Sequence, residues 1–207
     1  MEEVRCAFYR PTDPNEPFIN KATQWLTGKF VHVELVFFDD RTKKHNLACG
    51  VWQSETVFFR PKTFGRTSWS FKTVKVPKAK AAAMKLFCKE CAEKKLPFNK
   101  MGLLRCVTPF PRQTDGSSYF CSELAVCAFQ KAGIFPTAMP GMVTPSDLWE
   151  MINNINQFAD ASPLMTERIN QKGLKYSLHH KTGPRTNAPG ALNGKKIQKK
   201  WSTFSSK

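Results

Sequence analysis

Cys121 and His32 are the two residues of this chain best suited to nucleophilic chemistry. Cys121 starts a segment that predicts a helix: two serines precede it as possible caps, residues 124–129 carry no polar side chain, and Gly133 can close the helix. A thiol in the first turn of a helix lies beside unpaired backbone N–H groups, which stabilise a thiolate and could also hold an oxyanion. The competing interpretation is that Cys121 is an inert buried cysteine.

His32 lies in residues 30–38, whose β-branched and aromatic side chains are typical of a buried strand. The other three histidines have polar neighbours: His45, His179 and His180. A histidine in an apolar strand is usually structural, but it can also act as a general base. A cysteine on a helix, a histidine on a strand and a polar residue on the neighbouring strand are the parts of a thiol nucleophile, its base and the group that orients the base.

The residue that would orient His32 depends on the register of the hairpin that its strand enters. If the loop is tight, Glu55 lies across from His32; if residues 39–46 form the loop, Gln53 does. Both side chains could orient an imidazole. Side chains alternate along a strand, so Glu34 points to the same side as His32 and is a third candidate. The sequence leaves all three open.

The surrounding pattern predicts an α+β domain. Alternating or β-branched segments predict strands at 4–9, 30–38, 47–60 (one or two strands) and 68–76. Apolar residues at helical spacing predict helices at 17–27, 81–95, 121–133 and 144–155.

Length and charge divide the chain into a folded domain, residues 1–160, and a basic tail, residues 161–207, which we expect to be disordered. The chain of 207 residues has 32 Lys or Arg against 16 Asp or Glu, a formal charge of +16. Residues 171–207 contain nine Lys or Arg and no acid. Such a tail favours non-specific contact with nucleic acid or an anionic membrane.

The cysteines favour a reducing, intracellular compartment, since their number is odd and several lie in apolar segments: Cys6, Cys49, Cys88, Cys91, Cys106, Cys121 and Cys127. No apolar signal-peptide core starts the chain, and no apolar run approaches the ~20 residues of a membrane span. Cys88 and Cys91 form a C-x-x-C without a second pair, so we expect core packing there. We expect no metal and no cofactor, since neither a ligand spacing nor a Gly-rich phosphate loop is found.

Three motifs in order carry a resemblance: His-Val-Glu-Leu-Val-Phe at 32–37, Phe-Cys-Ser-Glu-Leu at 120–124 and Thr-Pro-Ser-Asp-Leu at 144–148. Over roughly residues 3–155 the chain resembles the circularly permuted papain-like proteins of the NlpC type, which include bacterial YiiX-like proteins and relatives in large DNA viruses. The resemblance implies a permuted papain-like α+β fold, with an antiparallel sheet packed against a central Cys-bearing helix. It is compatible with the cytoplasm, including that of a virus-infected cell.

The resemblance also implies roles for single residues. Cys121 matches the nucleophile and His32 the general base. The family usually has the third, polar residue on the strand after the histidine, where this chain offers Gln53 and Glu55. Glu34 stands where the bacterial members commonly have glycine, so its role could be local.

The implied activity is that of a thiol (cysteine) peptidase or amidase acting on a peptide or other amide-containing substrate. A second hypothesis is a lipid acyl hydrolase or acyltransferase, although the chain lacks the Asn-Cys-Glu-His-Phe motif and the hydrophobic anchor of such relatives. A third is an inactive papain-like module that binds nucleic acid or an anionic membrane through its basic tail.

Overall fold

The structure, a computed structural model, describes residues 1–12, 24, 27–106, 108 and 114–159. All of them belong to the first of two compact units, Met1–Arg168. The predicted tail, 161–207, lies outside the described residues, and so does most of the predicted helix 17–27, of which Gln24 and Thr27 are helical.

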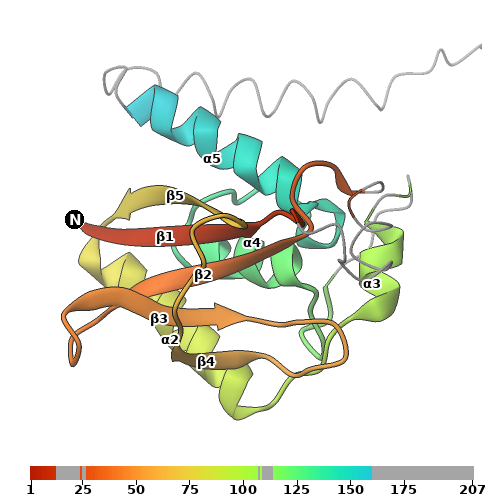
Figure 1. The fold of residues 1–207 in the computed structure, drawn as a ribbon, viewed down its shortest axis with the longest axis horizontal. Coiled ribbons are helices and arrows are strands. Elements are labelled where there is room, and N and C mark those ends of the chain that lie inside the picture. Colours follow the sequence, from red (N-terminus) through yellow and green to blue (C-terminus); the bar gives the residue numbers. More distant parts are fainter. Residues whose placement is uncertain (13–23, 25–26, 107, 109–113, 160–207) are drawn as a thin grey trace, which may run out of the picture. The chain divides into compact units, whose positions relative to one another are not determined.

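A five-stranded antiparallel sheet, in the order β4-β3-β2-β1-β5, forms the centre of this unit (Figure 1). The strands are β1 Glu2–Tyr9, β2 His32–Asp39, β3 Lys44–Gly50, β4 Phe58–Pro61 and β5 Trp69–Val76. The predicted strands are confirmed, and the run 47–60 is divided between β3 and β4 by a turn. Alternation along β1 and β2 places Val4, Phe8 and Val33 in the core.

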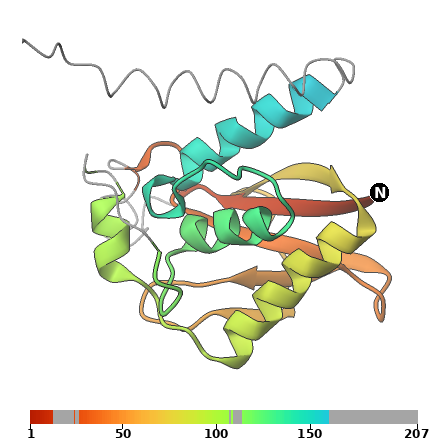
Figure 2. The ribbon, with the colours of Figure 1, turned by 180° about the vertical axis from the view of Figure 1, so that it is seen from behind.

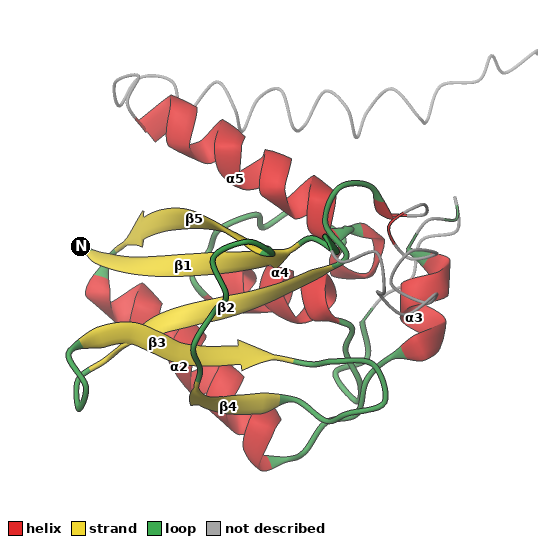
Figure 3. Ribbon diagram, viewed as in Figure 1, coloured by secondary structure: helices red, strands yellow, loops and turns green. Residues whose placement is uncertain are grey.

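Helices cover one face of the sheet, as the view from behind shows (Figure 2). The helices are α2 Lys78–Glu93, α3 Lys100–Arg105, α4 Cys121–Lys131, the short 3-10 helix η1 Pro140–Met142 and α5 Pro145–Ala159. The predictions 81–95, 121–133 and 144–155 are confirmed, whereas α3 was not predicted. Its start is fixed by Asn99, whose side chain accepts a hydrogen bond from Gly102 N at 2.7 Å. The architecture is therefore α+β, as expected from the sequence (Figure 3).

Helix α4 is buried on most of its circumference. Its buried residues include Leu124, Ala125, Val126, Ala128 and Phe129, all in the hydrophobic core. It contacts α2, β2 and η1, and the buried Ser122 Oγ donates to Val143 O at 2.7 Å. The absence of polar side chains over this stretch is thus explained by contacts on several sides.

The connection between β4 and β5, residues 62–68, crosses the face of the sheet opposite the helices (Figure 1). It links two strands that lie at opposite edges of the sheet. The connection therefore passes over the central strands, β1, β2 and β3 (Figure 1). Among the described residues, no helix is both long and apolar enough to cross a membrane.

Candidate active site

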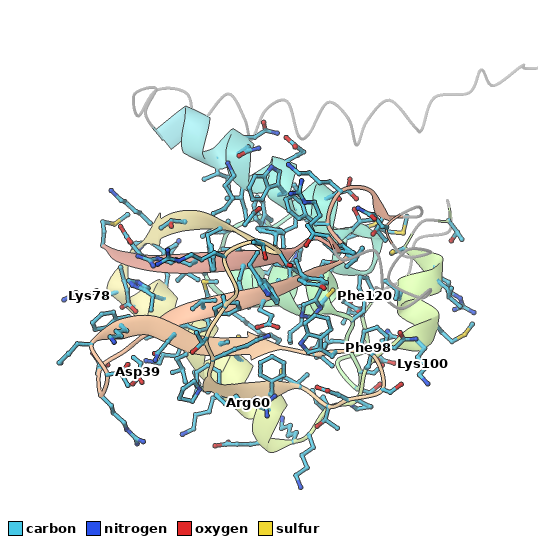
Figure 4. All side chains as sticks on the ribbon, viewed as in Figure 1. Asp39, Arg60, Lys78, Phe98, Lys100 and Phe120 are labelled. Carbon is cyan, nitrogen blue, oxygen red and sulfur yellow. The ribbon has the colours of Figure 1, made fainter. Side chains whose placement is uncertain are left out.

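Cys121 and His32 are brought together because α4 and β2 start at the same end of the sheet. Phe120, the residue before Cys121, lies near that end in Figure 4. Cys121 is one of the groups that raise the pKa of His32, through its charge and through side-chain hydrogen bonding, so the two side chains are neighbours. Each residue is only 4% exposed. The two residues that the sequence singled out for nucleophilic chemistry thus lie side by side in the interior.

The position of Cys121 is set by the way in which α4 starts. Phe120 is extended (φ −97°, ψ 170°) and precedes the helix as its N-cap residue. The buried carboxylate of Glu123 accepts a hydrogen bond from Phe120 N at 3.2 Å and another from Thr114 Oγ1 at 2.8 Å. This carboxylate satisfies a backbone donor and suits the positive end of the helix dipole. Cys121 therefore follows a backbone segment that the Glu123 carboxylate fixes by hydrogen bonds to Phe120 N and to Thr114 Oγ1.

Glu34 holds one nitrogen of the imidazole, Nε2. His32 Nε2 lies 3.1 Å from Glu34 Oε1, and the Glu34 carboxylate is fully buried. An ionised carboxylate only accepts hydrogen bonds, so Nε2 must carry the proton of a neutral His32. Nδ1 is then the ring nitrogen without a proton, which can accept one from Cys121.

Two further donors hold the same oxygen of Glu34. Trp52 Nε1 donates to Oε1 at 3.1 Å, and the Lys62 ammonium forms an ion pair with it. The other oxygen, Oε2, is buried and has no partner among the described residues. Gly50 leaves the space for this carboxylate, since a Cβ there would lie 2.8 Å from Glu34 Cγ, closer than real contacts allow.

Trp52, and neither Gln53 nor Glu55, is the residue across from His32. The β2–β3 pairing joins Leu35 to Cys49, and continuing it places Trp52 opposite His32. The indole stacks on the imidazole with ring centroids 3.7 Å apart and an interplanar angle of 24°.

Both registers considered from the sequence are therefore wrong. The loop is the turn 40–43, in which Lys43 has a positive φ of 55°, and a bulge between Phe37 and Phe38 shifts the pairing by one residue. Gln53 and Glu55 are exposed in the turn that follows β3. Of the three orienting candidates, the structure brings only Glu34 to His32.

Charges around His32 favour its protonated form. Burial by itself lowers the pKa of His32, but the charge of Cys121, a hydrogen bond with Cys121, and the hydrogen bond and charge of Glu34 raise it from 6.5 to about 9. Burial raises the pKa of Glu34, yet hydrogen bonds and charges from His32 and Lys62 overcome this and hold it below its usual 4.5. The arrangement therefore favours an imidazolium beside the ionised carboxylate of Glu34.

Five thiols elsewhere in this unit have a raised pKa. Burial raises the pKa of Cys91 to about 11 and those of Cys106 and Cys127 to about 12. It also raises the pKa of Cys6 and Cys88. Cys88 and Cys91 belong to the hydrophobic core, as predicted for the C-x-x-C. No group of three or more His, Cys, Asp or Glu within the described residues could hold a metal ion.

Sequence reasoning missed two residues of the site, Trp52 and Lys62. Trp52 adjoins the predicted Gln53, so a register shifted by one residue would have found it. Lys62 has no local signal, because it reaches Glu34 only through the path of residues 62–68 across the sheet. Of the remaining histidines, His45 lies against Phe38 in the β2–β3 hairpin, and His179 and His180 lie outside the described residues.

Comparison of the chain with protein-family models, with curated proteins and with solved structures finds no match in any of the three.

Proposed function

We propose that this protein is a cysteine hydrolase of the peptidase or amidase type, with a permuted papain-like fold. Cys121 is the nucleophile, His32 the general base and acid, and Glu34 the residue that orients His32. The observation that carries the proposal is the buried imidazole of His32, which has Cys121 as a neighbour and has its Nε2 held by the Glu34 carboxylate. The chain order, histidine on a strand before cysteine on a helix, supports the permuted assignment.

In the proposed acylation, His32 Nδ1 takes the Cys121 proton and the thiolate attacks the carbonyl carbon of an amide. The C–S bond forms while the carbonyl π electrons move to oxygen. Backbone N–H groups in the first turn of α4 are suited to hold this oxyanion, because they have no partner within the helix. The oxyanion then collapses, the C–N bond breaks, and the His32 imidazolium gives its proton to the leaving amine.

Deacylation uses the same residues in reverse roles. His32, neutral again, takes a proton from a water molecule, and the hydroxide attacks the thioester carbonyl. The C–S bond breaks, the acid leaves, and the Cys121 thiolate faces the imidazolium once more. Glu34 keeps Nε2 of His32 protonated in both acylation and deacylation, so that every proton transfer of the proposed cycle takes place at Nδ1.

Alkylation of Cys121 by iodoacetamide tests the dyad without knowledge of the substrate. We expect Cys121 to react at pH 6.5 about 100-fold faster than in His32→Ala, since a positioned base contributes about that factor or more. His45→Ala is the matched control and should leave the rate unchanged. Peptide mass spectrometry assigns the label. Equal rates in the wild type and His32→Ala would refute the dyad and favour a non-enzymatic module.

The substrate bond is tested next, with fluorogenic peptide amides and with acyl esters. We expect amide hydrolysis that declines as the pH rises through about 9, because His32 then loses the proton that the leaving amine needs. Turnover of lipid esters without amides would support the acyl hydrolase alternative instead.

A further inference from the structure

Lys62 is the first residue of the connection 62–68, and its ammonium is paired with the carboxylate of Glu34. The lysine side chain is 24% exposed, whereas the carboxylate is fully buried. The ion pair therefore lies at the boundary between solvent and the protein interior, with its anion on the inner side. A buried carboxylate has a large desolvation cost, which a single well-placed cation can offset.

Four aromatic rings surround the Lys62 ammonium. The distances from Nζ to the ring centroids are 4.7 Å for Trp69, 5.2 Å for Phe64, 5.3 Å for Trp52 and 5.7 Å for Phe58. Ring faces attract a cation and keep water away from it. The ammonium is thus held over Glu34 from several segments of the chain, which makes it a fixed charge and not a mobile surface lysine.

The charged groups around Glu34 alternate in sign. From β2 to the connection 62–68 they are the His32 imidazolium, the Glu34 carboxylate and the Lys62 ammonium. The neighbours of Glu34 on β1 and β3, Ala7 and Gly50, are neutral. Tyr9 is the titratable residue that pairs with His32 from β1.

His32 is charged in only part of the proposed cycle. When it is neutral, Lys62 is the remaining cation that contacts Glu34 among the described residues. Without Lys62, the buried Glu34 would tend to take up a proton. A protonated Glu34 can donate to Nε2, which would move the imidazole proton to Nδ1 and prevent it from accepting the thiol proton.

We propose that Lys62 is a positioning residue of the cysteine hydrolase site: its ammonium keeps Glu34 ionised throughout the cycle, so that Glu34 always holds the Nε2 proton and presents Nδ1 to Cys121. The inference rests on the proposed function. It explains why a lysine from a distant connection is placed under four aromatic rings instead of in solvent.

The test is the pH profile of Cys121 alkylation by iodoacetamide in Lys62→Met and Lys62→Arg. We expect Cys121 in Lys62→Met to be alkylated about tenfold more slowly near pH 6.5. A tenfold change is the factor that corresponds to a shift of one unit in the pKa of a group on which the rate depends. Lys62→Arg retains the charge and should restore most of the rate. Lys72→Met is the matched control, since Lys72 also lies over an aromatic ring, Trp149, at 4.4 Å and should leave the profile unchanged.

A double variant separates a role through Glu34 from a loss of folding. In a Glu34→Gln background there is no carboxylate for the Lys62 ammonium to keep ionised. Lys62→Met should therefore have no further effect on the rate of Cys121 alkylation. Thermal unfolding of every variant checks that it is folded. The role of Lys62 is overturned if Lys62→Met leaves the pH profile of Cys121 alkylation unchanged. It is also overturned if Lys62→Met lowers the alkylation rate equally in the wild-type and the Glu34→Gln backgrounds. If the wild type itself lacks the reaction at pH 6.5 that His32→Ala removes, the proposed function fails as well.

Discussion

Buried cysteines occur in two chemically opposite regions of this molecule, the start of α4 and the interface between α2 and the sheet. Cys121 is a neighbour of His32, whose Nε2 lies 3.1 Å from the Glu34 carboxylate, and that carboxylate is paired with the Lys62 ammonium. Cys88 lies in the hydrophobic core, where burial and the neighbouring thiol of Cys49 raise its pKa. The difference teaches that burial by itself raises the pKa of a thiol, and that the proposed nucleophile differs from Cys88 in having a base with its own charge partners beside it.

The contrast also holds within a single helix. Cys127 follows Cys121 on α4 and is more exposed, yet burial and the charge of Glu123 raise its pKa to about 12. Partial exposure therefore does not keep the pKa of Cys127 at its ordinary value. What distinguishes the two residues is the position of Cys121 in the first turn, next to His32.

The largest expected effect is on amide hydrolysis and comes from removing the charge of Glu34, which is present beside His32 and, among the described residues, has no counterpart near Cys88. Glu34→Gln should lower amide hydrolysis by about 100-fold or more, because an amide can offer either a donor or an acceptor to Nε2 and no longer fixes the tautomer of His32. The measurement is kcat/KM on a peptide amide that the wild type hydrolyses. Glu90→Gln, an exposed change on α2, is the control. If Glu34→Gln hydrolyses the peptide amide with the kcat/KM of the wild type, the carboxylate of Glu34 has only a structural role.

A smaller effect is expected from the thiols beneath α2. Cys88→Ser should reduce the free energy of unfolding by about 1–3 kcal/mol, since a hydroxyl replaces a thiol in an apolar core. Alkylation of Cys121 at pH 6.5 should be unchanged in the same variant. Urea unfolding and mass spectrometry give the two values. A loss of Cys121 reactivity without a loss of stability would mean that the two regions are coupled.

The smallest effect concerns stability at acid pH. The pKa of Glu34 is lower in the folded chain than its usual 4.5, so its contribution to stability is present above that pH and is lost as the pH falls through the folded value. Glu34→Gln should therefore flatten the decline of stability below pH ~4.5, whereas Glu90→Gln should not. Thermal unfolding between pH 3 and 7, roughly the range in which carboxylates titrate, measures both slopes. Parallel declines in both variants would contradict the assignment.

The elements of the fold could be predicted because their signals are local. Alternation identified the strands, and the start at Cys121 together with Gly133, which adopts a φ of 69°, marked both ends of α4. The start of α3 at Asn99 carried a readable cap signal that was overlooked. Residues that depend only on their own neighbours in the chain were thus within reach of sequence analysis.

The register of β2 and β3 was out of reach for a different reason. A bulge between Phe37 and Phe38 adds one residue to the pairing, and the sequence does not mark where strands will accept such an insertion. With the turn at 40–43 and no bulge, Val51 would lie across from His32, and the bulge moves Trp52 to this position. A loop of residues 39–46 would place Gln53 there instead, so a predicted hydrogen-bonding partner is replaced by a stacking one. The cause lies in the packing of both strands.

By itself, the sequence determined which side chains could do chemistry and which local element carries each of them. Cys121 at a helix start, His32 on a strand and Glu34 on the same side of that strand all follow from short-range periodicity. Only the tertiary structure decided that β2 and α4 start at the same place, that Trp52 covers the imidazole and that Lys62 reaches Glu34. These contacts join segments that are far apart in the chain. They form only when the sheet and the helices pack into one core, and that packing also brings a partner to the buried charged groups of the site.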